Sequence, residues 1–546
     1  MTENQLPLDR FLELEATQPN KVYLRQPYNG KWITYTWREV GQEARKLAHA
    51  IKAMDLPEKS NIALMSKNCA HWIITDLAIW MSGHISVPLY PTLTTESINQ
   101  ILEHSESKLF FVGKLDDWAS QRDGLIDVPR IDFSFWRNEG CTSWKEFIGT
   151  QTPLENVHHA APDDIATIIY TSGTTGMPKG VVHTHASVAW PAREALVQVG
   201  LNQERFISYL PLSHVAERLL IEMGSIFCAG EVYFAESLDT FKDNLVEASP
   251  TVFLAVPRIW TKFQLGILAK LPQKKLNTLL SIPIIKGLIQ KKIKKGLGLS
   301  ECKTALTGAA PISADLLEFF KKLDIEIMEV YGMTENFCVA TFNFPGTIKF
   351  GSVGVNWNKG EVKIDDNGEI LTRSAATMVG YYKEPGKTAE VLTDDGWLRT
   401  GDKGKLTDSG HLYITGRVKD LFKTSKGKYV APNPIEKMFA INEDIEQVCV
   451  MGSGMPQPFA IVTLSEIGQA KSQEQVQERL QGLLNKINSQ VEHYEALSKI
   501  IVANDEWTPE SGILTPTMKI KRNEVEKKYE PHVTAWHDKK ETVLFN

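Results

Sequence analysis

The spacing of apolar residues in the first half of the chain alternates between helical and strand-like periods. Thr36 and Glu39 have the spacing of a capping box at the start of a helix. The apolar residues that follow at helical steps are Val40, Ala44, Leu47, Ala48 and Ile51. Residues 62–65 and 85–89 have the pattern of buried strands, and residues 71–81 have that of a helix between them. This alternation predicts layered, parallel α/β structure.

The pattern changes near residue 350. Short strand-like runs there are separated by the turn sequences Asp366-Asn367-Gly368, Asp395-Gly396 and Ser409-Gly410, which predict a β-rich subdomain. Beyond residue 420 the pattern is mixed again, with a predicted strand at 499–502. A helical stripe is formed by Val476, Leu480, Leu483, Ile487, Val491 and Tyr494.

These patterns predict a division of the chain into two domains. We expect an α/β N-terminal domain at 1–416, built of layered subdomains plus the β-rich one. A hinge at 417–420 and a small α+β C-terminal domain at 421–546 follow. A length of 546 residues agrees with more than one hydrophobic core.

Composition narrows the class of protein. A hydrophobic content of 42% and a charged content of 23% are typical of a soluble globular chain, and a net charge of −6 argues against a general nucleic-acid binder. The six cysteines are scattered, which fits a reducing compartment and neither a zinc site nor a disulfide framework. The polar start and the absence of about 18 successive apolar residues lead us to expect a cytoplasmic protein.

The ten residues from 171 to 180 carry the first candidate chemistry. They read T-S-G-T-T-G-M-P-K-G. Glycines let backbone N–H groups converge on an anion, hydroxyls add donors, and Lys179 adds a mobile positive charge, so the loop suits a polyphosphate. Apolar β-branched residues flank it on both sides, which predicts a loop between two strands. A Walker loop would open a helix instead.

A second candidate motif is Tyr331-Gly332-Met333-Thr334-Glu335. The apolar run at 325–330 places it at the carboxyl end of a strand, where α/β proteins bind ligands. An aromatic ring can stack on adenine, a hydroxyl can bind phosphate, and a carboxylate can hold Mg²⁺.

Together these motifs resemble those of the adenylate-forming superfamily, which includes acyl-CoA synthetases, firefly luciferase and peptide-synthetase adenylation domains. The resemblance extends over almost the whole chain. It implies a two-step reaction in which a carboxylate attacks ATP to give an acyl-adenylate and pyrophosphate. A thiol then displaces AMP.

The resemblance also implies roles for particular residues. The phosphate loop would comprise Thr171, Ser172, Gly173, Thr174, Thr175, Gly176 and Lys179. The adenine pocket would be lined by Gly308, Ala309, Ala310 and the ring of Tyr331, whereas Ser313 suggests that 308–311 is also a plain strand-to-helix turn. Thr334 would contact phosphate, Glu335 would bind magnesium, Asp402 would hold the ribose, and Arg417 would reach the ribose or phosphate.

The C-terminal part of the chain matches the segments that change position during the family's reaction. Lys519 matches the catalytic lysine that orients the carboxylate and stabilises charge at the α-phosphate. Met518 stands where many relatives have glycine, so Lys521 stays an alternative. Lys419 matches the hinge at which the C-terminal domain rotates. Gly427, in the loop 423–428, matches the lining of the thiol tunnel.

Two groups of histidines remain open to more than one interpretation. His214 lies in a segment that runs beside the carboxylate pocket in the family, and a structural role is nearly as well supported. His183 and His185 have the spacing of metal ligands on one strand face, but no third ligand accompanies them.

Three stretches resemble long-chain acyl-CoA synthetases in particular, namely 211–218, 250–260 and 378–382. We therefore expect an AMP-forming acid–thiol ligase that uses a fatty acid, ATP, Mg²⁺ and coenzyme A. Two alternatives are a fatty acyl-AMP ligase that loads a carrier protein, and a non-catalytic nucleotide-binding protein on the same fold.

One basic stretch is not explained by these motifs. Residues 276–299 combine apolar side chains with Lys286, Lys291, Lys292, Lys294 and Lys295. A solvated face of a surface helix is one interpretation. Contact with an anionic membrane or with the phosphates of coenzyme A is the other. Pro283 interrupts the predicted helix.

Overall fold

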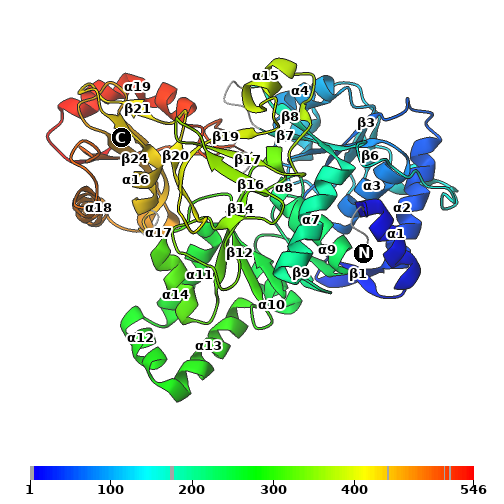
Figure 1. The fold of residues 1–546 in the computed structure, drawn as a ribbon, viewed down its shortest axis with the longest axis horizontal. Coiled ribbons are helices and arrows are strands. Elements are labelled where there is room, and N and C mark those ends of the chain that lie inside the picture. The colour runs from blue at the N-terminus through cyan, green and yellow to red at the C-terminus, as the bar shows by residue number, and fades with distance from the viewer. Residues whose placement is uncertain (1–4, 172–176, 440–441, 509–510, 516–517) are drawn as a thin grey trace.

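The computed structural model describes residues 5–171, 177–439, 442–508, 511–515 and 518–546. Figure 1 shows a large N-terminal part, coloured blue to yellow, and a small C-terminal part in orange and red at one end. The structure is mixed α/β throughout, which confirms the predicted fold class.

The first half is organised around a seven-stranded sheet with strand order β18-β8-β7-β4-β3-β5-β6. Its strands are β3 (Asn61–Met65), β4 (Ile85–Leu89), β5 (Leu109–Val112), β6 (Arg130–Asp132), β7 (Ile165–Thr171), β8 (Lys179–Thr184) and β18 (Gly380–Tyr381). The strands from β7 to β6 are parallel, whereas β8 pairs antiparallel with both β7 and β18. The segment between Thr171 and Lys179 therefore joins two strands, as predicted, and these two strands are antiparallel.

Helices from the first 150 residues pack against this sheet or against one another. They are α1 (Pro7–Thr17), α2 (Trp37–Lys52), α3 (Ala70–Met81), α4 (Thr95–Ser105), α5 (Trp118–Arg122) and α6 (Trp144–Ile148). Thr36 and Glu39 form the predicted capping box at the start of α2. All twelve residues of α3 are buried. Such a helix can exist only between other layers of structure, so it forms the centre of the first core.

Two further sheets complete the α/β part. One contains β1 (Val22–Tyr28), β2 (Lys31–Thr36), β9 (Arg205–Ser208) and β10 (Glu231–Phe234); the other contains β11 (Val252–Leu254), β12 (Thr304–Thr307), β13 (Ile327–Tyr331), β14 (Thr341–Phe342) and β15 (Val355–Asn356). Their helices are α7 (His185–Val199), α8 (Val215–Glu217), the π-helix η1 (Arg218–Met223), α9 (Gly224–Cys228), α10 (Phe241–Ala248), α11 (Pro257–Lys270), α12 (Gln273–Ser281), α13 (Pro283–Leu297) and α14 (Ala314–Lys322). Pro283 begins α13, so the basic segment is two helices.

The β-rich subdomain is an antiparallel sheet with strand order β16-β17-β19-β20. Its elements are β16 (Glu361–Ile364), β17 (Glu369–Arg373), β19 (Leu398–Leu406), β20 (Leu412–Arg417) and the neighbouring helix α15 (Pro385–Val391). Gly368 has a φ of +80° in the turn between β16 and β17, a conformation that glycine adopts without strain.

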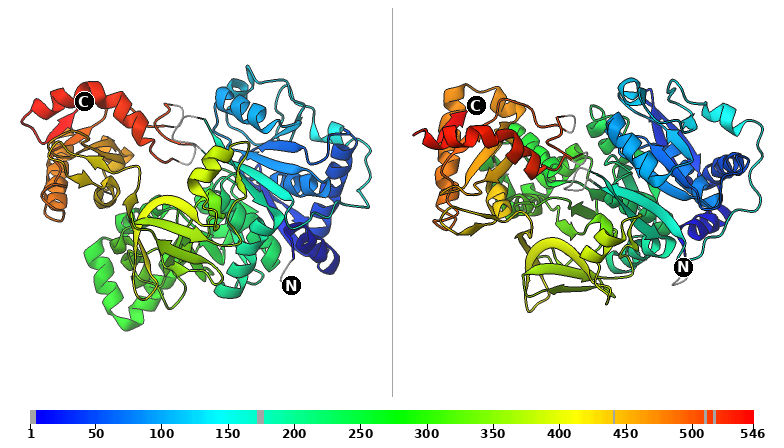
Figure 2. Two further views of the ribbon diagram at one scale, coloured as in Figure 1. Left: turned by 45° about the horizontal axis from the view of Figure 1, so that its top comes forward. Right: turned by 90° about the horizontal axis from the view of Figure 1, so that it is seen from above.

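The C-terminal part has its own core between a four-stranded sheet and helices. Its elements are β21 (Phe422–Lys423), β22 (Tyr429–Val430), β23 (Ile445–Met451), β24 (Phe459–Leu464), β25 (Ile500–Val502), β26 (Val543–Phe545), α16 (Pro432–Phe439), α17 (Glu466–Gln469), α18 (Gln473–Asn488) and α19 (Arg522–Asp538). Both views in Figure 2 show this part joined to the yellow β-rich subdomain and lying apart from the blue N-terminal layers.

One predicted element is shorter in the structure. The helical stripe continues to Tyr494, but α18 ends at Asn488. The Asn488 side chain donates to the carbonyl oxygen of Leu497 and accepts from its N–H, at 2.9 and 2.8 Å. These bonds fasten the end of the helix to the following loop, so Val491 packs against the core from that loop.

Candidate active site

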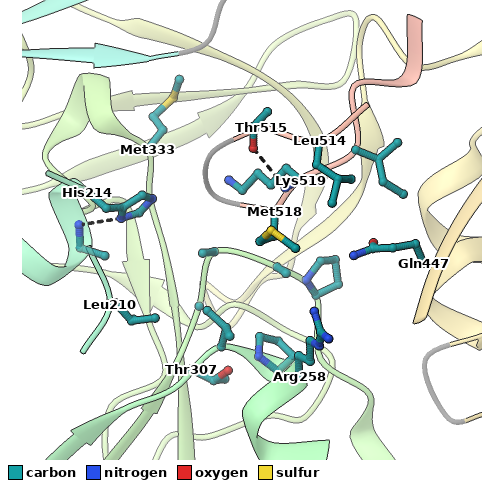
Figure 3. A pocket seen from close by; sticks show the side chains of 18 of the residues that line it. Leu210, His214, Arg258, Thr307, Met333, Gln447, Leu514, Thr515, Met518 and Lys519 are labelled. Carbon is teal, nitrogen blue, oxygen red and sulfur yellow. Dashed lines mark hydrogen bonds between the residues drawn. The ribbon is translucent and has the colours of Figure 1, made fainter. Parts of the chain in front are cut away.

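A cleft of about 3090 Å³ lies between the N-terminal and C-terminal parts, and both contribute to its walls. Among its lining residues are the predicted site residues Thr171, Lys179, Gly308, Ala309, Ala310, Tyr331, Thr334, Glu335, Asp402, Arg417, Lys419, Lys519 and His214. The sequence distributes these residues over seven segments, and the fold brings them to one cavity. Figure 3 shows Lys519 extending from the C-terminal part towards His214.

Asp402 holds two neighbours at one end of the cleft. Its Oδ2 accepts from the Tyr331 hydroxyl at 2.7 Å, and its Oδ1 accepts from Arg417 Nε at 2.9 Å. Asp402 and Arg417 lie directly opposite each other in the β19–β20 ladder, so strand register places this ion pair. Partial desolvation opposes the charge of the half-exposed Arg417 side chain, but the attraction of Asp402 raises the pKa of the guanidinium above its usual value. The result is a preformed carboxylate beside an aromatic ring.

Glu335 and Lys179 are connected through a residue of another segment. The Tyr381 hydroxyl donates to Glu335 Oε1 at 2.7 Å, and the Lys179 amine lies over the Tyr381 ring, 4.8 Å from its centroid. Burial, followed by the nearby Glu335 charge, raises the pKa of Tyr381, so this phenol stays a proton donor. The lysine at the end of the phosphate loop and the carboxylate of the second motif therefore face the same space.

The backbone of the second motif is tightly packed. A Cβ on Gly332 would lie 2.2 Å from the carbonyl carbon of Cys338, so only glycine fits there. His183 Nε2 donates to the carbonyl oxygen of Thr334 at 2.7 Å, and burial lowers the pKa of His183 to about 4. The neutral ring of His183 thus links β8 to the turn at Thr334 by a hydrogen bond.

The segment 308–310 forms the wall next to this motif. A Cβ on Gly308 would lie 2.9 Å from the carbonyl oxygen of Val330, so glycine allows this close approach. Ala309 has a φ of +64°, an uncommon conformation for a residue with a side chain. Ser313 caps α14 by accepting from the N–H of Leu316. The segment is therefore both a cleft wall and a strand-to-helix turn, as the two sequence interpretations allowed.

Lys519 reaches the cleft from a tight turn. Its N–H donates to Thr515 Oγ1 at 3.1 Å, and its carbonyl oxygen accepts from the Thr515 N–H at 2.8 Å. The side chain is exposed to the open cleft, although protein walls surround it. Desolvation by these walls, and next the charge of Arg417, lower the pKa of the Lys519 amine. The amine also lies within electrostatic range of Glu335.

His214 begins α8, where its Nδ1 accepts from the N–H of Ala216 at 3.1 Å. Burial, followed by the Lys519 charge, lowers the pKa of His214 to about 3, so the ring is neutral. The histidine both caps a helix and lines the cleft. Beyond it the wall becomes apolar, with small and aliphatic residues from α7, η1 and α9: Ala192, Ala195, Val199, Leu219, Leu220 and Gly224.

Some predicted residues are not brought into the cleft. Gly427 has a φ of +78° in the β21–β22 turn and is absent from the lining of the cleft, whereas Lys423 and Tyr429 beside it are present. Residues 172–176 lie outside the described residues. His185 packs against the edge of Trp80. Among the described residues there is no cluster of three metal-ligating side chains. His183 and His185 therefore have no third ligand with which to bind a metal ion there.

Sequence reasoning missed two residues of the cleft. Tyr381 was noticed only as part of a subgroup pattern, although the turn sequence around Gly380 and the aromatic pair at 381–382 were available signals. Arg258, at the start of α11, forms an ion pair with Glu446 of β23 across the two parts. No local pattern indicates that pairing because the two residues lie in separate domains.

Comparison with known proteins identifies the class. The family model described as AMP-binding enzyme matches residues 12–382, and that described as AMP-binding enzyme C-terminal domain matches 419–541. The chain therefore belongs to the AMP-binding enzyme family.

Two curated relatives and one solved structure are among its matches. The chain is 28% identical to long-chain-fatty-acid–CoA ligase ACSBG2 of Xenopus laevis, over 96% of this chain and 83% of that protein. It is 29% identical to long-chain-fatty-acid–CoA ligase 5 of Mus musculus, over 94% and 85%. The adenylation domain of a carboxylate reductase from Mycobacterium chelonae shares the fold with a TM-score of 0.81 and 22% identity, over 98% and 92% of the two chains.

Proposed function

We propose that the protein activates a fatty acid with ATP to form acyl-AMP and pyrophosphate. It then transfers the acyl group to coenzyme A with release of AMP. The observation that carries this proposal is the convergence of Lys179, the 331–335 motif, Asp402 and Lys519 on one cleft. The curated relatives named above as long-chain-fatty-acid–CoA ligases support the choice of acid and thiol.

In this proposal the adenosine occupies the end of the cleft near Asp402. The carboxylate is acceptor-only and can take both ribose hydroxyls, with Arg417 fixing its orientation at 2.9 Å. The ribose hydroxyls would compete with Tyr331 for Asp402, which would free the phenol ring to lie against adenine. Gly308 to Ala310 would supply the opposite wall.

The phosphates would lie between Lys179, Thr334 and Glu335. Glu335 Oε1 accepts from Tyr381, and its carboxylate lines the cleft. A single carboxylate fits Mg²⁺, because this ion is usually bound by one or two carboxylates together with phosphates and water. When bound there, Mg²⁺ would neutralise phosphate charge. Lys179 would add a positive charge from the opposite side.

Lys519 would act in the first half-reaction. A positive amine in the cleft can orient the substrate carboxylate and offset negative charge that develops at the α-phosphate. Neutral His214 would border the carboxylate without adding charge. The apolar wall formed by α7, η1 and α9 is suited to the hydrocarbon chain of a fatty acid.

The second half-reaction would need another orientation of the C-terminal domain. In the orientation described here Lys519 lines the cleft and Gly427 does not. We propose that residues 417–420 form the hinge between domains 1–416 and 421–546. Rotation at Lys419 would withdraw Lys519 and bring the 423–428 loop to the thiol path.

The proposal is tested by product analysis with MgATP, coenzyme A and a panel of fatty acids. We expect acid-dependent formation of AMP and acyl-CoA. Formation of ADP as the nucleotide product would refute the assignment. Release of AMP only when a carrier protein is added, with no acyl-CoA formed, would mean that the carrier protein and not coenzyme A is the acceptor.

Lys519→Ala tests the role of the lysine. Loss of one charge contact in the transition state should slow acid-dependent ATP–pyrophosphate exchange by about 10²–10³-fold. Transfer from supplied acyl-AMP to coenzyme A should persist. Lys521→Ala is the matched control, since Lys521 was the alternative in the sequence. A larger loss of exchange in Lys521→Ala, or equal loss of both half-reactions in Lys519→Ala, would contradict the assignment.

A further inference from the structure

We propose that the α12–α13 hairpin docks this protein on the surface of an anionic lipid bilayer. The hairpin exposes large apolar side chains. Ile284 is 85% exposed, Leu288 is 67% exposed and Ile282 is 40% exposed. All three lie at or near the junction of the two helices, and Figure 1 shows α12 and α13 projecting from the edge of the molecule.

The same region is strongly basic. Between Glu247 and Glu301 the chain has no acidic residue. Its cationic residues there are Arg258, Lys262, Lys270, Lys274, Lys275, Lys286, Lys291, Lys292, Lys294 and Lys295. The whole chain carries a net charge of −6, so positive charge is concentrated here against the overall balance. Such a concentration is attracted to anionic headgroups by about 1 kcal/mol per lysine near the surface.

The two features share one face of α13. Ile284, Leu288, Lys291 and Lys295 recur at helical spacing and are all exposed. Their stripe is opposite the inner side of the helix, where Ile289, Ile293 and Leu297 pack against the core. The outward face therefore offers apolar side chains near the tip of the hairpin and ammonium groups further along.

A bilayer surface matches this arrangement better than an acidic protein surface does. Headgroup phosphates lie directly above hydrocarbon, so one surface can take up both the lysines and the exposed Ile284 and Leu288. Of the lysines in the hairpin, Lys294 is engaged by Asp324, at 2.6 Å. Lys291, Lys292 and Lys295 are exposed. No helix in the described part of the chain is long and apolar enough to span a bilayer, so the contact is interfacial.

The position of the hairpin relates docking to the cleft. Helix α11 leads directly into the hairpin, and its residues Ile259, Lys262 and Leu265 line the cleft. Docking would therefore hold one wall of the cleft close to the bilayer. This inference does not depend on the proposed reaction, because the hairpin contributes exposed side chains of its own.

Flotation of the full chain with phosphatidylcholine vesicles, with and without phosphatidylglycerol, tests the proposal. We expect binding to the anionic vesicles that weakens as salt is raised. Replacing Lys291, Lys292 and Lys295 together by Gln should weaken that binding about 10²-fold. Ile284→Ser with Leu288→Ser should weaken it about tenfold or more, because apolar area is no longer inserted.

Matched controls separate docking from general changes of surface. Val197 is 80% exposed on α7, so Val197→Ser removes an equally exposed apolar side chain elsewhere. Replacing the exposed Lys31, Lys145 and Lys540 by Gln changes the charge equally. Both controls should bind like the unaltered protein. Absence of binding to anionic vesicles, or equal weakening by hairpin and control variants, would overturn the proposal. Competition by an acidic protein without vesicle binding would assign the surface to a protein instead.

Discussion

Met518 has a left-handed backbone, with a φ of +61°, directly before the candidate catalytic lysine. This conformation costs a residue with a side chain about 1–2 kcal/mol. The turn imposes it here, because the N–H of Met518 donates to the carbonyl oxygen of Thr515 at 2.8 Å. The approach of Lys519 to the cleft therefore depends on a strained residue.

Substitution at Met518 should change the first half-reaction selectively. Met518→Gly removes the strain and should leave ATP–pyrophosphate exchange equal or higher. Met518→Val places a β-branched side chain in the left-handed region and should lower exchange about tenfold, because Lys519 is no longer held in place. Transfer from supplied acyl-AMP should be unchanged in both variants. Equal exchange rates in the glycine and valine variants would show that the backbone of this turn does not position the lysine.

The sequence predicts individual site residues where the side chains of a motif suit a recognisable ligand or reaction. Tyr331 and Glu335 are predicted in this way, Asp402 and Lys519 are predicted from the resemblance to the family, and all four line one cleft. Tyr381 was not found because its role depends on contacts with Glu335 and Lys179, which the fold alone brings together.

At the scale of elements, a buried ionic network joins α3 to η1. The Arg218 guanidinium forms ion pairs with Asp76 and with Glu222, and all three side chains are fully buried. Arg218 Nη1 also donates to Thr167 Oγ1 at 2.5 Å. Two carboxyls thus depend on one cation in the layer that supports the apolar wall of the cleft.

Removing that cation should strongly destabilise the protein. Arg218→Met leaves two buried carboxyls without their partner, which should lower the free energy of unfolding by about 3–5 kcal/mol. Denaturant unfolding measures this change. The triple variant Arg218→Met, Asp76→Asn and Glu222→Gln should recover much of the loss, because no charge is then left unpaired. A loss below about 1 kcal/mol in the single variant would mean that the two carboxyls do not need the cation.

The boundaries of helices and strands show how far the spacing of apolar residues predicts the structure. The strands at 62–65 and 85–89, the helix at 71–81 and the strand–loop–strand around the phosphate loop were all predicted, because burial follows their apolar pattern directly. The end of α18 was predicted wrongly. Its apolar stripe continues beyond Asn488, whereas the helix ends at that residue, whose side chain bonds to the backbone of Leu497.

At the scale of the molecule, contacts across the cleft hold the C-terminal part in its present orientation. Arg258 of α11 pairs with Glu446 of β23. The N–H of Val418 donates to the carbonyl oxygen of Gly401 at 2.8 Å, which anchors the chain just before the exposed turn at Lys419. Patterning in the sequence predicts two domains but cannot indicate their relative orientation, since no local signal encodes it.

Lys419→Pro should separate the two half-reactions. Proline fixes φ near −65° and restricts the residue before it, so the turn could no longer change conformation. We expect near-normal ATP–pyrophosphate exchange and loss of acyl-CoA synthesis. A melting curve must accompany both assays. Unchanged acyl-CoA synthesis would mean that no rotation occurs at this residue, and loss of exchange with a lowered Tm would mean that the fold is damaged.

Lys519 belongs to a part of the chain that is joined to the rest by the short connection between β20 and β21. This connection keeps the lysine close to the cleft. Lys519 reaches the cleft in the same way as a ligand attached by a short linker. A short linker maintains an effective concentration of about millimolar order. Cutting the chain between Arg417 and Phe422 would turn the encounter into one between two molecules. At micromolar protein the supply of the lysine would then fall about a thousandfold, although every residue that lines the cleft would still be present.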